Sequence, residues 1–142
     1  MKSLSYFYLS VIIFSLSIFS LSTFAQRPII YDSPQYEYSL AKELFEKEKY
    51  GSAQEYFKQV FDNEQTPQEM KVAAYYHIGI CAFFLNNQDA DFYLKNYIRL
   101  YPEHFNVLNA YFYLGKFYFD QKKYKQVLEN FNQIDERFVP EK

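Results

Sequence analysis

The side chains best suited to chemistry are a histidine and a cysteine four residues apart, His77 and Cys81. In a helix this spacing places both on one face. A metal site needs more ligands than these two, and a catalytic Cys–His pair needs a third group that orients the histidine. A helix interior also gives the thiol no evident activation. We therefore expect a packed thiol and a partly exposed helix histidine, without a metal site or a catalytic residue.

The other motifs do not predict a cofactor site. His104 falls in the turn at 101–104, where we expect a simple turn residue. The 3 glycines are isolated, so they form no Gly-rich phosphate loop. The alternating charges from Lys42 to Lys49 are typical of a solvated helix end rather than an acid–base pair. We expect no enzyme activity, no cofactor and no small-molecule substrate within these 142 residues.

The composition indicates a single helical domain. The chain contains 16 Tyr and 16 Phe but only 3 Gly and 5 Pro, too few to punctuate a many-stranded sheet. Long stretches of periodic apolar residues with little glycine favour helices instead. The formal charge of −2 gives no basic footprint for nucleic acid, and the single cysteine excludes an internal disulfide framework.

The first 25 residues have the order of a secretory signal peptide. Lys2 supplies one positive charge, residues 6–21 form an uncharged apolar run, and Thr23 and Ala25 place small residues before a cleavage point. The run is shorter than the ~20 residues of a spanning helix, so we expect cleavage; a retained anchor is the alternative. We expect an exported protein, periplasmic or outer-membrane-associated in a Gram-negative bacterium, that contacts a membrane only through this segment if uncleaved.

Three segments of the remaining chain share one residue pattern. The first helix of each has an apolar residue followed by a very small one, and the small residues are 38 and 36 positions apart. The second helix of each has three residues at i, i+4 and i+7, which share one face. Small residues are needed where paired helices cross closely. The residues expected to pack the repeats are Ala41, Gly79 and Gly115 in the first helices and Ala53, Ala90 and Val127 in the second.

Capping signals set the expected helix starts. Ser33–Pro34 offers an N-cap followed by proline at the first helical position. Thr66–Pro67–Gln68–Glu69 adds a capping box to the same arrangement. With the repeat pattern, these signals predict helices at 34–47, 50–63, 67–85, 89–100, 106–121 and 124–137.

The pattern resembles the tetratricopeptide repeat (TPR), which has large-x-x-Leu-Gly-x-x-Tyr in its first helix and Ala-x-x-x-Phe in its second. The departures are Glu37 in place of a large aromatic residue, a shortened inner turn at 86–89, and Val127 in place of alanine. The resemblance implies an all-α fold, a right-handed superhelix of about three helix-turn-helix pairs. It divides the chain into a signal peptide at 1–25, a linker at 26–33 and a TPR domain at 34–142, with repeats at about 34–66, 67–102 and 106–140.

A second resemblance concerns the start of the chain. The run FAQ, followed by IIYDSPQYEYSLAKELFEKEKYGSAQEYFKQV, is similar to the start of large exported TPR proteins of Bacteroidota-type bacteria, where many more repeats follow. Here the sequence ends where a fourth repeat would begin, without the polar capping helix of a solenoid. We expect either the N-terminal part of a longer scaffold or a short form closed by self-association through its C-terminal helix.

The TPR resemblance also implies a partner-binding surface. In the family, a concave groove is lined by first-helix residues three before the small residue and one, four and five after it. Here these positions form two aromatic columns, and aromatic residues are enriched at binding hot spots. Lysines at the rim would hold an acidic group. The positions are Tyr38, Lys42, Phe45 and Glu46, then Tyr76, Ile80, Phe83 and Phe84, then Phe112, Lys116, Phe119 and Asp120.

An alternative is that these rings pack between repeats as ordinary core. It is weaker for the whole set, because Phe83 and Phe84 are neighbours on a helix and face different ways. A carboxylate clamp like that of chaperone-binding TPR domains is not expected, since only Lys42 and Lys116 could serve in it. We expect a scaffold or adaptor that binds a protein or peptide, in cell-envelope assembly. The alternatives are a structural spacer, or a fragment of a longer multi-repeat protein or of a TPR-containing sensor or enzyme.

Overall fold

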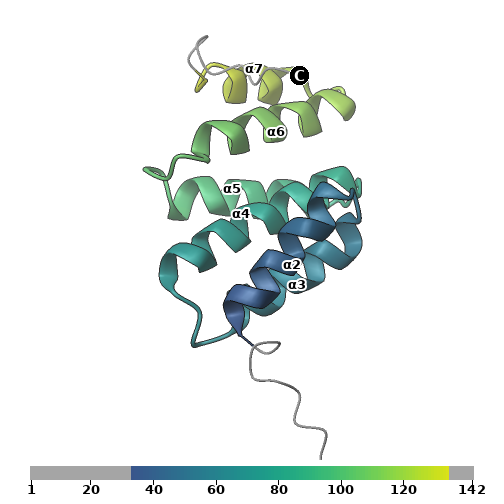
Figure 1. The fold of residues 1–142 in the computed structure, drawn as a ribbon. Coiled ribbons are helices and arrows are strands. Elements are labelled where there is room, and N and C mark those ends of the chain that lie inside the picture. The colour runs from purple at the N-terminus through teal and green to yellow at the C-terminus, as the bar shows by residue number, and fades with distance from the viewer. Residues whose placement is uncertain (1–32, 135–142) are drawn as a thin grey trace, which may run out of the picture.

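The structure is a computed structural model that describes residues 33–134, and this part of the chain forms six helices and no strand (Figure 1). The all-α expectation is therefore confirmed. The proposed signal peptide at 1–25 lies outside the described residues, as does the linker except for Ser33. The helices are α2 (Pro34–Glu46), α3 (Tyr50–Asp62), α4 (Gln68–Phe84), α5 (Ala90–Leu100), α6 (Val107–Asp120) and α7 (Tyr124–Phe131).

The boundaries of five helices agree with the predicted ranges within two residues, but the last helix is shorter. α7 ends at Phe131, and residues 132–134 form a turn and a bend instead of the predicted helix. The amide of Asn132 still donates to the Leu128 carbonyl, whereas Gln133 and Ile134 donate only three residues back. The prediction of helix is therefore wrong for 132–134, and 135–137 lie outside the described residues.

The helices stack in the order of the chain (Figure 1). Each helix packs against the one before it and the one after it, and α4 also contacts both α2 and α6. Successive first helices therefore adjoin one another, and the second helices α3 and α5 each lie between two first helices. This is the arrangement of a helical-repeat protein, in which each repeat contacts only its neighbours.

The turn inside each helix pair has the same backbone conformation. One residue in each adopts a left-handed φ: 57° at Glu48, 55° at Asn86 and 60° at Lys122. In the first turn the amide of Lys49 donates to the Leu44 carbonyl at 2.9 Å, and the other two turns have the equivalent bond. This is the Schellman motif, which usually has glycine or asparagine at the left-handed position. The three positions are 38 and 36 apart, as are the small residues, so the backbone repeats with the sequence.

The six small or branched residues predicted to pack the repeats are all buried. Gly79 lies against α5, where an added Cβ would be 3.0 Å from the Leu94 Cδ2 atom. Gly115 lies against Phe131, and a Cβ atom placed on Gly115 would be only 2.3 Å from the Cε1 atom of that ring. The second helix of each of these pairs can therefore come close to the first, because the side chain is missing.

One of the two predicted caps is confirmed. The Ser33 hydroxyl accepts a hydrogen bond from the Tyr36 amide at 3.2 Å, and Pro34 begins α2. The capping box at Thr66 is wrong, because Pro67 is extended (ψ 142°) and α4 begins at Gln68 without a side-chain cap. Thr66 therefore stands one residue before the N-cap position of α4, which Pro67 occupies. Its Oγ1 atom is buried with no hydrogen-bond partner within the described structure.

Two apolar clusters hold the stack together. The first joins α2, α3 and α4 around Phe57, Val60 and Ile78, and the second joins α4, α5, α6 and α7 around Leu94 and other buried side chains. Phe57 and Leu94 are fully buried, and burial of such a side chain is worth roughly 1.5–3 kcal/mol. Because α4 contributes to both clusters, it couples the first pair to the rest.

Candidate protein-binding surface

The His77–Cys81 face of α4 lies in the core. His77 is buried rather than partly exposed as predicted, and its ring stacks on Phe57 with centroids 4.6 Å apart. Its Nδ1–H donates to the Ala73 carbonyl at 2.8 Å, and burial lowers the pKa of the imidazole to about 4. Burial raises the pKa of the Cys81 thiol to about 12. At neutral pH both groups are uncharged, so the thiol is not activated and the pair fills space.

His104 anchors the turn between α5 and α6. Its Nδ1 atom accepts hydrogen bonds from the Tyr97 hydroxyl and from the Asn106 amide. The ring centroids of His104 and Phe105 are 4.2 Å apart. Because Tyr97 is fully buried, the turn is fixed to the core through this histidine, consistent with the predicted turn residue.

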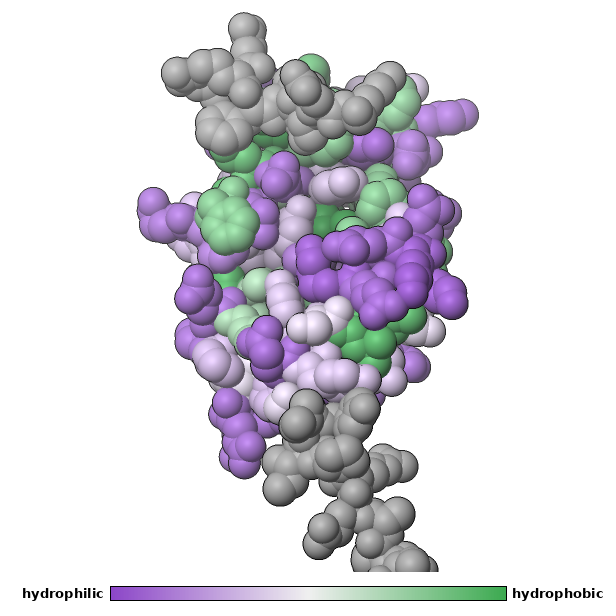
Figure 2. Space-filling model, viewed as in Figure 1, coloured by the Kyte–Doolittle hydropathy of each residue, from purple (hydrophilic) through white to green (hydrophobic). Residues whose placement is uncertain are grey.

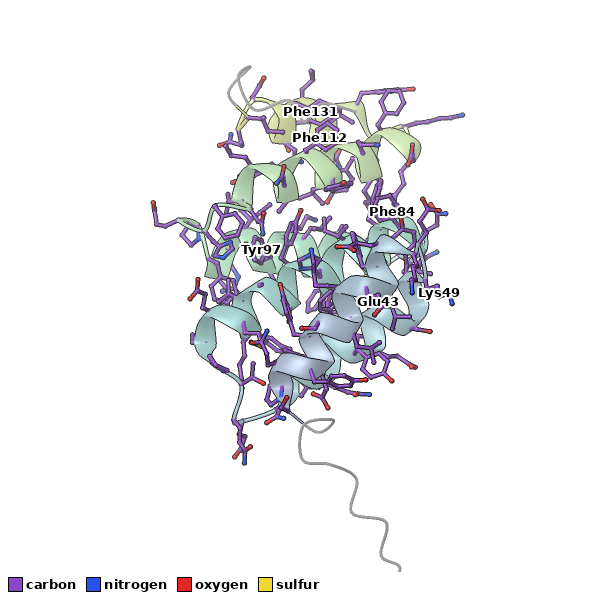
Figure 3. The ribbon with its side chains drawn as sticks, in the orientation of Figure 1. Glu43, Lys49, Phe84, Tyr97, Phe112 and Phe131 are labelled. Carbon is purple, nitrogen blue, oxygen red and sulfur yellow. The ribbon has the colours of Figure 1, made fainter. Side chains whose placement is uncertain are left out.

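Potential metal ligands do not gather in the part of the chain that the structure describes. No group of three or more His, Cys, Asp or Glu side chains is placed to hold an ion there. The predicted charge run at the end of α2 is exposed: Lys47 and Glu43 form a hydrogen-bonded ion pair, and this bond holds the pKa of Glu43 below its usual value. Figure 2 shows the hydrophilic patch at this end of α2, and Figure 3 labels Glu43 and Lys49 there.

Aromatic rings form a continuous band from the C-terminal ends of α2 and α4 to the middle of α6 and the end of α7, which we call the ring band. At the α2 end, Phe84 stacks on Tyr50 at 4.5 Å and lies 6.2 Å from Phe45. At the α6 end, Tyr113 lies 5.7 Å from Phe84 and 5.2 Å from Phe83. These contacts connect all three repeats. The members of the ring band are Phe45, Tyr50, Phe83, Phe84, Phe112, Tyr113 and Phe131.

The ring band ends at the third pair. Phe112 contacts Tyr113 at 5.5 Å and stacks on Phe131 of α7 at 6.1 Å (Figure 3). The Lys116 ammonium lies 5.5 Å from the Phe112 ring centroid and 5.8 Å from that of Phe83. A cation over aromatic faces is favourable by roughly 0.5–1 kcal/mol at an exposed site. Lys116 is exposed, so it presents a positive charge beside the rings.

Parts of the ring band remain accessible. Phe84 is 37% exposed and Phe131 is 36% exposed, while the other five rings are half-buried. A hollow of about 160 Å³ lies beside Phe83, between the ends of α4 and α6. Exposed rings next to a hollow offer apolar area to a partner.

Several predicted groove residues lie elsewhere. Tyr76 and Ile80 are buried at 8% and 2% exposure, so they belong to the core and not to an accessible groove. Tyr38 packs edge-on against Phe57 at 5.7 Å and lines a separate hollow of about 290 Å³ between α2 and α4. Phe119 is 58% exposed and contacts Tyr124 rather than the ring band.

The ring contacts in the structure therefore do not follow the two aromatic columns predicted from the sequence. Among the described residues, the band crosses between repeats through Phe84 and Tyr113, whereas Phe45 and Phe83 make no direct ring contact. Phe84, five residues after Gly79, contacts rings of both neighbouring first helices, whereas within the described structure Phe83 contacts only that of the next one. Lys42 is half-buried and close enough to His77 that its charge helps to lower the pKa of that residue.

Three members of the ring band were not in the predicted groove. Tyr50 and Phe131 belong to second helices, and Tyr113 stands two residues before Gly115. The sequence did carry one relevant signal: Tyr50 and Tyr124 open their second helices at matching positions. In the structure both pack against the end of the preceding first helix, Tyr50 on Phe45 and Tyr124 on Phe119.

Within residues 33–134 no helix is both long and apolar enough to cross a membrane. Comparisons of the chain with protein-family models, with curated proteins and with solved structures find no match.

Proposed function

We propose that this chain is an exported TPR-type scaffold that binds a protein or peptide at the ring band. The TPR assignment draws on the residue pattern and on the recurring Schellman turns and small residues at the same spacing. These features support a superhelix of repeats, whose first helices line one surface in TPR proteins. Cell-envelope assembly is the process we favour, because of the predicted signal peptide.

The observation that carries the proposal is the continuity of the ring band across three repeats. Phe84 and Phe131 are the accessible rings of this band, and Lys116 adds a positive charge beside Phe112. Aromatic anchors surrounded by half-buried neighbours are typical of binding hot spots. A peptide laid from the ends of α2 and α4 to the middle of α6 would cover these rings, with an acidic residue near Lys116.

Photo-crosslinking tests the proposal. A photoreactive residue replaces Phe84 in the full chain, expressed in a Gram-negative host of the native type, and the captured protein is identified by mass spectrometry. A probe at Lys125, whose side chain is 88% exposed on α7, is the control. We expect one partner captured at Phe84 and not at Lys125, and the purified partner then binds the chain in solution.

Two matched variants make the result specific. Phe84→Ala removes an accessible ring of the band, and Phe92→Ala removes a ring of α5 that is 58% exposed and outside the band. We expect Phe84→Ala to weaken binding about tenfold or more and Phe92→Ala to have little effect. Equal affinities for the two variants would mean that the ring band is not the binding surface.

Export has its own test. Residues 1–25 lie outside the described residues, so cleavage after Ala25 is proposed from the sequence. N-terminal sequencing of the protein recovered from the periplasm should begin at Gln26. A chain that begins at Met1 and stays with the membrane fraction would instead indicate a retained anchor.

The spacer alternative is favoured by the outer side of α7. There Leu128 is 63% exposed and Tyr124 is 59% exposed, and the two lie one turn apart on the same face of the helix. If these residues mediate self-association, sedimentation should show a dimer that Leu128→Lys dissociates, while Phe84→Ala leaves it intact. A monomer at all concentrations would remove the support for this alternative.

A further inference from the structure

A cavity of about 560 Å³ lies between α5, α6 and α7, on a different side of α6 from the ring band. Tyr111, Leu114 and Tyr118 face it, whereas Phe112 belongs to the ring band, and the helical spacing puts these two sets on separate faces. The volume is within the range of ligand pockets. The cavity is lined by Lys95, Ile98, Arg99, Tyr111, Leu114, Tyr118, Gln126, Glu129, Asn130 and Gln133.

The same place exists one repeat earlier, where it is filled. We call the contact of α3, α4 and α5 the first junction and that of α5, α6 and α7 the second junction. In the first junction, the ring centroid of Tyr75 lies 4.9 Å from that of Phe61. It lies 6.1 Å from the centroid of Tyr93 and 6.4 Å from that of Tyr101. The ammonium of Lys58 lies 5.8 Å from the Tyr93 ring centroid. Four rings and a cation therefore fill the space between the two pairs.

The repeat spacing identifies the counterparts in the second junction. Counting from the small residues of each helix, Tyr75 corresponds to Tyr111, Phe61 to Ile98 and Tyr93 to Asn130. Two rings are thus replaced by smaller side chains while the backbone keeps its repeat. α7 packs on α6 through Phe131 against Gly115, and the space that the two rings leave remains as the cavity between α5, α6 and α7.

The cations persist around the empty position. Lys95 is the counterpart of Lys58; it bonds to Asp91 at 3.2 Å and lies 5.3 Å from the Tyr118 ring centroid. Arg99 donates to the neutral Asn96 amide oxygen at 3.2 Å. Among the described residues, no carboxylate lies within ion-pair distance of Arg99. The cavity therefore has an apolar floor, amide groups and the Glu129 carboxylate from α7, and two cations from α5. Lys95 is paired with Asp91 and Glu129 lies 3.9 Å from Lys125, whereas Arg99 has no ion pair among the described residues.

We propose that this cavity is a second peptide site, which takes an aromatic side chain of a partner with a carboxylate next to it in sequence. The ring occupies the room that Tyr93 fills in the first junction, with Tyr111 and Leu114 as its floor. The adjacent carboxylate pairs with Arg99, which presents donors in a planar fork suited to it. This proposal is independent of binding at the ring band, since the two sites use different faces of α6.

Amide chemical shifts of the full mature chain, titrated with short capped peptides, test the site. The probes are acetyl-Gly-Tyr-Glu-Gly-amide, the same peptide with Gln for Glu, and the same with Ala for Tyr. We expect saturable shifts in α5, α6 and α7 with the Tyr-Glu peptide. Each of the other two peptides should bind about tenfold more weakly or worse.

Variants locate the binding. Asn130→Tyr puts a ring into the cavity as in the first junction and should abolish binding, and the surface variant Arg99→Glu should weaken it about tenfold or more. Phe84→Ala, which alters only the ring band, should leave it unchanged. Unaltered binding by Asn130→Tyr, equal binding of the three peptides, or shifts confined to the ring band would overturn the proposal.

One more variant distinguishes a partner from the chain itself. Phe138, outside the described residues, is the counterpart of Tyr101 by the same spacing. If the Tyr-Glu peptide binds only after Phe138→Ala, the chain's own C-terminal segment is the occupant, and the proposal of a partner peptide is wrong. Equal binding with and without Phe138 supports the partner.

Discussion

The first and second junctions have the same helix arrangement but differ in the side chains that lie between the helices. Phe61, Tyr75, Tyr93 and Tyr101 close the first junction, whereas Ile98 and Asn130 leave the second with a cavity of about 560 Å³. In a repeat protein, stability is approximately a sum of repeat and interface terms. The repeat pattern therefore sets the helix spacing, while individual side chains decide whether an interface is filled or contains a cavity.

α7 is the least buried of the three second helices. Only Val127 and Asn130 of α7 are buried, whereas α3 buries four residues and α5 buries three. Few buried contacts and an exposed outer face are the features of a segment that opens before the rest. A weakly held wall suits a site that must admit a side chain.

Acid should loosen the packing of α4 on the first pair, where His77 contacts Phe57, more than the packing of α6 on the second pair, where Tyr113 is the counterpart of His77. The imidazole has a pKa of about 4 when folded and about 6.5 when unfolded, so between these values the unfolded chain binds more protons. Stability is therefore full above pH 6.5 and falls as the pH drops toward 4, by up to about 3 kcal/mol. Urea unfolding at pH 7 and pH 4.5 measures the loss.

The control is His77→Gln, which removes the titrating group and keeps a hydrogen-bonding side chain. Its stability should fall less between the two pH values, because every other titratable group is common to both proteins. An equal fall for both proteins would show that His77 is not the source.

Emptying the first junction is the next largest change. Tyr93→Asn copies the residue that stands at Asn130 and removes the ring between Tyr75 and Lys58. We expect a loss of about 2 kcal/mol, less than for a fully buried ring because Tyr93 is partly exposed. Chemical denaturation measures it, and Phe105→Asn, at a site 78% exposed, is the control. Equal losses would show that the rings do not stabilise this junction.

The reverse change should strengthen the second junction. Asn130→Tyr fills the cavity and gives up only the hydrogen bond from the Asn130 amide to the Gln126 carbonyl. We expect about 1 kcal/mol of added stability from the newly buried ring, together with slower amide hydrogen exchange in α7. Faster exchange in α7 would mean that the ring does not fit and that the two junctions differ in helix spacing as well.

The sequence was sufficient for the repeat architecture but not for this difference. Ala41, Gly79 and Gly115 mark the close crossings, so helix order and spacing followed from them. Which rings touch depends on how far neighbouring helices are shifted along their axes. The residue pattern does not fix this shift, so it does not show whether Phe83 or Phe84 faces the preceding helix. The cavity is the absence of side chains contributed by separate helices, and no local pattern records it.

The connections between pairs offer a smaller test. In the α5–α6 connection the His104 Nδ1 atom is hydrogen-bonded, whereas in the α3–α4 connection the Thr66 Oγ1 atom is buried without a partner among the described residues. Thr66→Val replaces the hydroxyl by a methyl group of similar size and should raise stability by about 1 kcal/mol. Thr66→Ser keeps the hydroxyl and should not, as thermal unfolding would show. A destabilised Thr66→Val would indicate a hydrogen bond to water at this site.

The smallest expected effect distinguishes the three turns. Glu48 and Lys122 adopt left-handed φ values that cost a residue with a Cβ about 1 kcal/mol, while Asn86 tolerates this region better. Glycine removes that strain but adds freedom to the unfolded chain, so Glu48→Gly and Lys122→Gly should each stabilise by only about 0.5 kcal/mol. Asn86→Gly should change little, and differential scanning calorimetry can resolve the ranking. If Lys122→Gly alone has no effect while Glu48→Gly stabilises, the third pair is already open at its melting temperature, and the weakness lies in the second junction rather than in the turn.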